Sequence, residues 1–193
     1  MSAFISAQEF ASRRSHLMQA VGPDAAVILP AAIHHHRNRD SEYRFRQHSN
    51  FYYLTGFAEP EAVVVLLPGR SEGEFVLFCR PRDREMEIWN GYRAGPEGAV
   101  ANFSADQAFV INELAQRLPE LLAGRRQIHA PMGEHPAFEQ QLTQVLVGLR
   151  ARSRAGVAAP LSLQVLDATL SEQRLIKSSA EIAVMQRALY DVV

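Results

Sequence analysis

The sequence lacks most of the features that would place a chain of 193 residues in a specialised class. It has one cysteine, so a disulfide framework within the chain is impossible, which fits a reducing compartment. No apolar run approaches the ~20 residues that span a bilayer, and no basic segment followed by an apolar core marks a signal peptide. The formal net charge of −1 leaves no broad positive surface for nucleic acid. We therefore expect a cytoplasmic protein with neither nucleic-acid nor membrane partners.

The sequence also lacks the short motifs that identify common catalytic sites. It contains no G-x-G-x-x-G or G-x-x-x-x-G-K-[ST] loop for phosphate, no G-x-S-x-G elbow and no H-E-x-x-H zinc motif. Cys79 ends the apolar run Phe75–Cys79, which favours a buried structural thiol over a nucleophile. The residues alone thus predict no catalytic residue and no self-sufficient active site.

The histidines give little support for a metal site. The run His34–His36 would not chelate one ion well, because neighbouring side chains of an extended strand point to opposite faces. His129 and His135 are typical of a loop pair without a function. Asp40 and Glu42 could act as paired carboxylates in acid–base chemistry, although ordinary polar loops contain such pairs too. We predict no metal ligand in the chain.

Short apolar segments alternate with amphipathic ones, which predicts an α/β domain with a mixed β-sheet flanked by helices. Ala62–Leu67 and Phe75–Cys79 are expected to form an antiparallel hairpin, because a turn rich in glycine and charge joins them. Further extended segments are expected at Ala25–Leu29, Ser49–Gly56, Glu87–Trp89, Ala108–Ile111 and Gln127–Ala130. Loops are expected at Gly91–Gly98 and Arg150–Pro160, and helices after Ser6, from Leu114 with a bend or division at Pro119, from Pro136, and over Leu166–Ile176.

The last residues differ from the rest of the chain. Ser178 and Glu181 form a capping box that opens a further helix, with Ile182, Met185 and Leu189 on one face. This apolar stripe has no evident mate in the remaining sequence. We therefore expect residues 1–176 to form one domain and residues 177–193 to begin the linker and first helix of a following domain. The alternative is a terminal helix that docks back on the first domain.

The most informative segment is Tyr43–Phe57, which holds six of the sixteen aromatic residues. With Asp40–Tyr43 before it and Glu59–Ala62 after it, this segment resembles the N-terminal domain of Xaa-Pro aminopeptidase (aminopeptidase P). Two later segments, Glu87–Gly91 and Arg174–Ile182, match the same family in the expected order.

The resemblance implies a creatinase-like N-terminal α/β domain that precedes a "pita-bread" catalytic domain. In that family the catalytic domain binds two metal ions, usually manganese, which activate water to attack the bond between the first residue and a following proline. The resemblance places none of those ligands in this chain, so the chain alone should be inactive and need no cofactor. Its expected partners are its own C-terminal catalytic domain, neighbouring subunits of a homo-oligomer and peptides with proline second.

The resemblance also implies three substrate-binding positions at the entrance to the active site. Asp40 would pair with a peptide amine or an arginine, and Trp89 would form an aromatic wall. Arg154 would hold a carboxylate, with Arg150 and Arg152 as competitors for that role. The alternative for each position is a structural ion pair or a core tryptophan. Two other functions stay open: a peptide- or protein-binding module of a catalytically dead relative, and a prolidase-type dipeptidase or creatinase.

Overall fold

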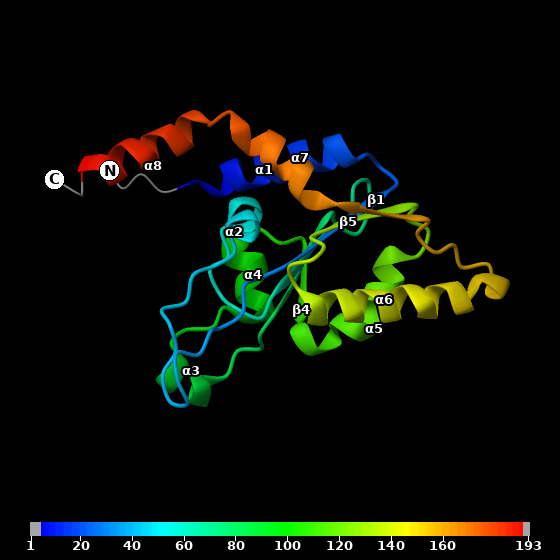
Figure 1. Ribbon diagram of the computed structural model, residues 1–193, viewed down its shortest axis with the longest axis horizontal. Helices are drawn as coiled ribbons and strands as arrows, with labels where there is room; N and C mark the ends of the chain where they lie inside the picture. The colour runs from blue at the N-terminus through cyan, green and yellow to red at the C-terminus, as the bar shows by residue number, and fades with distance from the viewer. Residues whose placement is uncertain (1–4, 191–193) are drawn as a thin grey trace.

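The computed structural model describes residues 5–190 of the chain. It contains a six-stranded mixed sheet with helices on both faces, as the sequence predicted (Figure 1). The strand order is β4-β3-β2-β1-β5-β6. The strands are β1 (Ala25–Pro30), β2 (Val63–Leu66), β3 (Phe75–Cys79), β4 (Gln107–Val110), β5 (Gln127–Ala130) and β6 (Ser162–Val165). The helices are α1 (Ala7–Val21), α2 (Ser49–Thr55), α3 (Arg84–Asn90), α4 (Gly95–Phe103), α5 (Leu114–Leu122), α6 (Pro136–Ala151), α7 (Leu166–Leu175) and α8 (Ser179–Tyr190), with short 3₁₀ turns at η1 (Ile111–Glu113) and η2 (Ser153–Ala155).

The centre of the sheet is β1, which pairs antiparallel with β2 and parallel with β5. Strands β2 and β3 form the antiparallel hairpin expected from the sequence, and β4 and β6 pair parallel at the two edges. Strand β2 therefore runs opposite to the other five. Because β1, β5 and β6 are parallel, Pro30, Ala130 and Val165 end at the same edge of the sheet.

Two hydrophobic cores form because side chains alternate across the sheet. Val27 and Leu29 of β1 pack on the face covered by α1, α2, α4 and α7. Ala26 and Ile28 pack on the opposite face, under α5 and α6. Helix α5 is continuous with Pro119 inside it, so the expected division there does not occur.

Two buried arginines of α1 fix the end of α2. Arg13 donates to the carbonyl of Tyr53 at 3.2 Å, and Arg14 donates to the carbonyl of Leu54 at 2.9 Å. These bonds satisfy two carbonyls in the last turn of α2, where no backbone N–H of the helix is left to donate to them. Burial lowers the pKa of Arg14 to about 10, so the guanidinium stays charged at neutral pH. Helix α2 is therefore held rigidly against α1.

Two expected extended segments are helices instead. Ser49–Gly56 contains α2, because Phe51 and Leu54 are one helical turn apart and both are fully buried, and Gly56 ends the helix at φ 66°. Glu87–Trp89 lies in α3, where the Asp83 carboxylate accepts from two backbone N–H groups of the first turn, each at 3.1 Å. The high aromatic content of Ser49–Gly56 favoured a strand prediction, although the spacing of its buried residues is helical.

The sequence pattern did not predict two further elements, α4 and β6. Helix α4 begins at Gly95, inside the expected glycine loop, and Pro96 lies in its first turn. Strand β6 is an exposed edge strand, so it lacks the apolar pattern that marks a buried one. By contrast, both capping boxes begin helices: Ser6 accepts from the Glu9 N–H at 3.1 Å, and Ser178 and Glu181 bond reciprocally at 2.9 and 3.3 Å.

Within residues 5–190, no helix combines the length and the apolar character that crossing a membrane requires.

Candidate functional site

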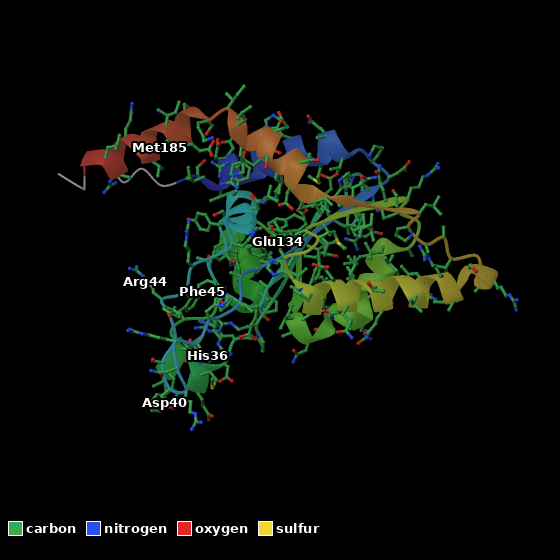
Figure 2. The ribbon with its side chains drawn as sticks, viewed as in Figure 1. His36, Asp40, Arg44, Phe45, Glu134 and Met185 are labelled. Carbon is green, nitrogen blue, oxygen red and sulfur yellow. The ribbon has the colours of Figure 1, made fainter. Side chains whose placement is uncertain are left out.

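Asp40 and Trp89, two of the residues assigned by resemblance to the substrate entrance, lie at one end of the molecule. There the loop after β1 approaches α3 (Figures 1 and 2). A cavity of about 550 Å³ lies between the two segments, with His34 and Glu42 on the loop side and Trp89 on the α3 side. Asp40 does not line this cavity.

Asp40 lies in a tight turn that its neighbours hold in place. The Asn38 side-chain carbonyl accepts from the Asp40 N–H at 3.1 Å and from the Ser41 N–H at 3.0 Å. The Arg37 N–H closes the turn on the Ser41 carbonyl at 2.9 Å. The Asp40 side chain is exposed, and among the described residues it is in no ion pair within 4.0 Å. The Asp40 side chain is therefore exposed on a turn whose backbone is fixed by hydrogen bonds.

Trp89 is 83% exposed, although tryptophan is usually among the most buried side chains. Helix α3 buries none of its residues, and Ile88 beside Trp89 is 80% exposed. Glu87 fixes the helix, because its carboxylate pairs with Arg82 at 3.3 Å and accepts from the Arg93 N–H at 3.3 Å. Trp89 is therefore not part of the core formed by the described residues.

The inner wall of the same cavity is charged. Glu59 pairs with Arg80 at 3.5 Å and accepts from the Ala94 N–H at 2.7 Å. Arg80 and Arg93 are both nearly buried, and the Nε atom of each has no hydrogen-bond partner within the described residues. Both arginines also line the cavity, and guanidinium groups at a cavity wall can bind a carboxylate or a carbonyl oxygen. The cavity thus combines cationic donors with an aromatic wall.

Arg154 lies elsewhere. It belongs to η2, which follows α6 at the end of the molecule opposite to α3 in Figure 1. A cavity of about 530 Å³ near it is lined by Arg150 and Ser153, but not by Arg154 or Arg152. One copy of the chain therefore does not bring Arg154 to Asp40 and Trp89. A single site that used all three would need more than one copy.

A second groove runs beside the C-terminal helix. Its volume is about 540 Å³, and it is lined by Arg13, Tyr53 and Arg174 on the domain side and by Val184 and Met185 on α8. The apolar stripe expected on α8 stays exposed: the exposed fractions are 45% for Ile182, 55% for Met185 and 72% for Leu189. Figure 2 shows Met185 on the part of α8 that extends past the sheet.

The structure also joins residues that the sequence did not connect. His48, Glu134 and His135 converge where the chain enters α2 and α6. Burial lowers the pKa of His48, although Glu134 opposes that effect, so its ring is neutral at pH 7. His129 is not part of this group: it lies in β5, and burial lowers its pKa too. The expected loop pair of His129 and His135 is therefore wrong.

The described residues do not fit a dinuclear manganese centre. Their one group of three His, Cys, Asp or Glu ligands within 4.8 Å of one another contains a single carboxylate, Glu134. Manganese prefers oxygen ligands, and a two-ion site needs carboxylates that hold both ions. Cys79 is no alternative ligand, because it is buried in the core and burial raises its pKa to about 12.

Comparison with known proteins supports one family. The profile of the "Aminopeptidase P, N-terminal domain" matches residues 10–129. The chain is 40% identical over 185 residues to the Xaa-Pro aminopeptidase of Escherichia coli, covering 95% of this chain and 42% of that protein. It is 32% identical over 204 residues to human Xaa-Pro aminopeptidase 3, covering 95% of this chain and 38% of that protein. The chain thus spans less than half the length of these relatives.

Solved structures give the same result. The chain superposes on the aminopeptidase PepP of Pseudomonas aeruginosa with a TM-score of 0.92 and 45% identity, covering 95% of this chain and 42% of that one. For E. coli aminopeptidase P with the inhibitor Pro-Leu, the TM-score is 0.88 and the identity 40%, covering 95% of this chain and 42% of that one. At 40–45% sequence identity these structures share the family of this chain and not only its fold.

Proposed function

The chain belongs to the aminopeptidase P N-terminal domain family, and from this premise we propose that it is the non-catalytic domain of an Xaa-Pro aminopeptidase. The observation that supports this most directly is the match of 95% of the chain to 42% of the E. coli Xaa-Pro aminopeptidase. The longer protein would hydrolyse the bond between an N-terminal residue and a following proline. Its two manganese ions would bind in a catalytic domain that follows the region described here.

In this proposal the domain shapes the substrate entrance. Exposed Trp89 and the charged cavity behind it offer an aromatic surface for proline and donors for a peptide carbonyl or carboxylate. Asp40 offers an unpaired carboxylate to a peptide amine or an arginine. Their exposure supports this role, because aromatic and charged side chains that are largely exposed on their own domain are available to a partner.

Oligomerisation belongs to the same proposal. Arg154 lies at the opposite end from α3, so the three entrance residues would meet only if neighbouring subunits share their sites. The exposed stripe on α8 would pack against the catalytic domain that follows, with the domain boundary near residue 177; the exposure of Ile182, Met185 and Leu189 supports this part of the proposal. We assign the protein to the cytoplasm as part of the proposal.

The test is substrate length. A protein that carries this domain followed by its catalytic domain is assayed with manganese on an Xaa-Pro-Xaa tripeptide and on an Xaa-Pro dipeptide. The proposal expects much faster cleavage of the tripeptide. Preference for the dipeptide would instead assign a prolidase. Binding of the tripeptide without cleavage would assign a catalytically dead binding module.

A further inference from the structure

His48, Glu134 and His135 form a compact group of three potential metal ligands. Glu134 Oε2 lies 3.5 Å from His48 Nε2 and 4.0 Å from His135 Nε2. In the part of the chain that the structure describes, no other three His, Cys, Asp or Glu side chains bring their ligand atoms within 4.8 Å of one another. We propose that these residues bind one divalent transition-metal ion of the zinc class, with a fourth coordination position left to water.

The spacing suits such an ion. Zinc binds nitrogen and oxygen at about 2.0–2.2 Å, so tetrahedral ligands lie about 3.4 Å apart. The observed 3.5 and 4.0 Å exceed this by about 0.1 and 0.6 Å, and the three ligand atoms all lie within 4.8 Å of one another. Side-chain rotations can close such gaps. His135 Nε2 is also buried and makes no hydrogen bond to a described residue. An ion would supply its missing partner.

The backbone before α2 holds His48 in place. The side-chain oxygen of Gln47 accepts from the His48 N–H at 2.9 Å and from the Ala32 N–H at 2.8 Å. Its amide nitrogen donates to the carbonyl of Glu59 at 2.7 Å. Gln47 thereby ties the start of α2 to the segment that follows β1 and to the segment that precedes β2. A ligand whose backbone is fixed in this way loses little entropy when it binds an ion.

The turn before α6 holds the other two ligands. The Glu139 carboxylate accepts from the Gly133 N–H at 2.8 Å and from the His135 N–H at 3.2 Å. Glu134 lies between these two bonded residues, so the whole turn is fixed. The carboxylate of Glu139 also offsets the positive end of the helix dipole, which would otherwise disfavour a cation.

The group occupies the position in the sheet where ligands are expected. Strands β1 and β5 are parallel neighbours, but the chain leaves β1 toward α2 on one face and β5 toward α6 on the other. Such a switch point leaves a crevice at the carboxyl edge of the strands. Figure 2 shows Glu134 between α2 and the start of α6. Two charged side chains farther off act on His48 in opposite senses: Asp167 would favour a cation there, and Arg174 would oppose it.

The ligand types select the ion. Two imidazole nitrogens and one carboxylate suit zinc, and also nickel or copper, whereas manganese, magnesium and calcium prefer oxygen ligands. The histidine run offers a matched control on the same chain. His36 Nδ1 lies 3.8 Å from Glu42 Oε1, but its side chain is 70% exposed and it joins no three-ligand group. The proposal departs from the expectation that the chain holds no metal ligand and does not depend on peptidase activity.

The test is zinc binding to the tag-free 193-residue chain after treatment with a chelator, followed by isothermal titration calorimetry with zinc chloride. We expect one ion per chain, at least tenfold weaker binding in Glu134→Gln and His135→Ala, and unchanged binding in His36→Ala. Cobalt should give visible absorption bands of a tetrahedral site that Glu134→Gln removes. Circular dichroism and urea unfolding in chelator confirm that each variant is folded.

Three results would overturn the proposal. These are no saturable zinc binding by the unmodified chain, loss of binding in His36→Ala alone, and unchanged affinity in a folded Glu134→Gln variant. Glu134 is half exposed, so its amide variant is expected to fold even if His135→Ala does not.

Discussion

Replacing Trp89 by alanine separates a functional side chain from a structural one. The side chain is 83% exposed, so truncation removes little buried area and should change the free energy of unfolding by no more than ~0.5 kcal/mol. Phe51→Ala is the structural reference: this ring is fully buried, and its truncation should cost ~3–5 kcal/mol. Urea unfolding of the 193-residue chain measures both values.

The functional effect is measured in the longer protein. An aromatic contact with bound peptide is worth ~0.5–1.5 kcal/mol, so Trp89→Ala should lower kcat/KM on an Xaa-Pro-Xaa peptide by roughly two- to tenfold. Trp89→Phe should restore most of the loss. Ile88→Ala is the matched control, because Ile88 is 80% exposed on the same helix and does not line the cavity. The reasoning fails if Trp89→Ala leaves kcat/KM unchanged, or if it destabilises the domain as Phe51→Ala does.

Three further predictions concern buried groups. Arg14→Met should lower the free energy of unfolding by ~1–3 kcal/mol, because it leaves the Leu54 carbonyl without its donor; no change in urea unfolding would contradict this. Burial lowers the pKa of His48 and His129 below 6.5, so the folded chain binds fewer protons than the unfolded one. Their contribution to stability is therefore complete above pH 6.5 and is lost as the pH falls; urea midpoints that stay constant from pH 7 to 5 would refute this. Cys79, whose pKa burial raises to about 12, should resist iodoacetamide at pH 8 until the chain is unfolded; native-state alkylation would show an accessible thiol.

The sequence predicted the sheet better than the helices that cover it. Val63–Leu66 and Phe75–Cys79 are short apolar runs between turns, and such runs favour buried strands wherever they pack. Phe51 and Leu54 belong to a helix of 7 residues, too short to show a clear period amid so many aromatics. Strand β6 is exposed, so burial left no pattern in its residues.

Of the candidate site residues, some could be predicted from local motifs and others could not. Asp40 and Trp89 came from a resemblance between local motifs, and the structure presents both at one end of the domain. His48 and His135 lie in separate segments of the chain, with no ligand spacing that a motif could describe. Only the parallel pairing of β1 and β5 brings the loops that hold them together. A group of ligands from separate segments depends on the order in which the strands pair. The residue pattern of the sequence does not specify that order.

Peptidase activity of the isolated chain decides whether this domain is non-catalytic. The 193-residue chain and a longer protein that carries it with a catalytic domain are incubated with manganese and an Xaa-Pro-Xaa tripeptide. We predict release of the first residue by the longer protein only. Hydrolysis by the 193-residue chain itself would show that it contains a complete active site and is not a non-catalytic domain.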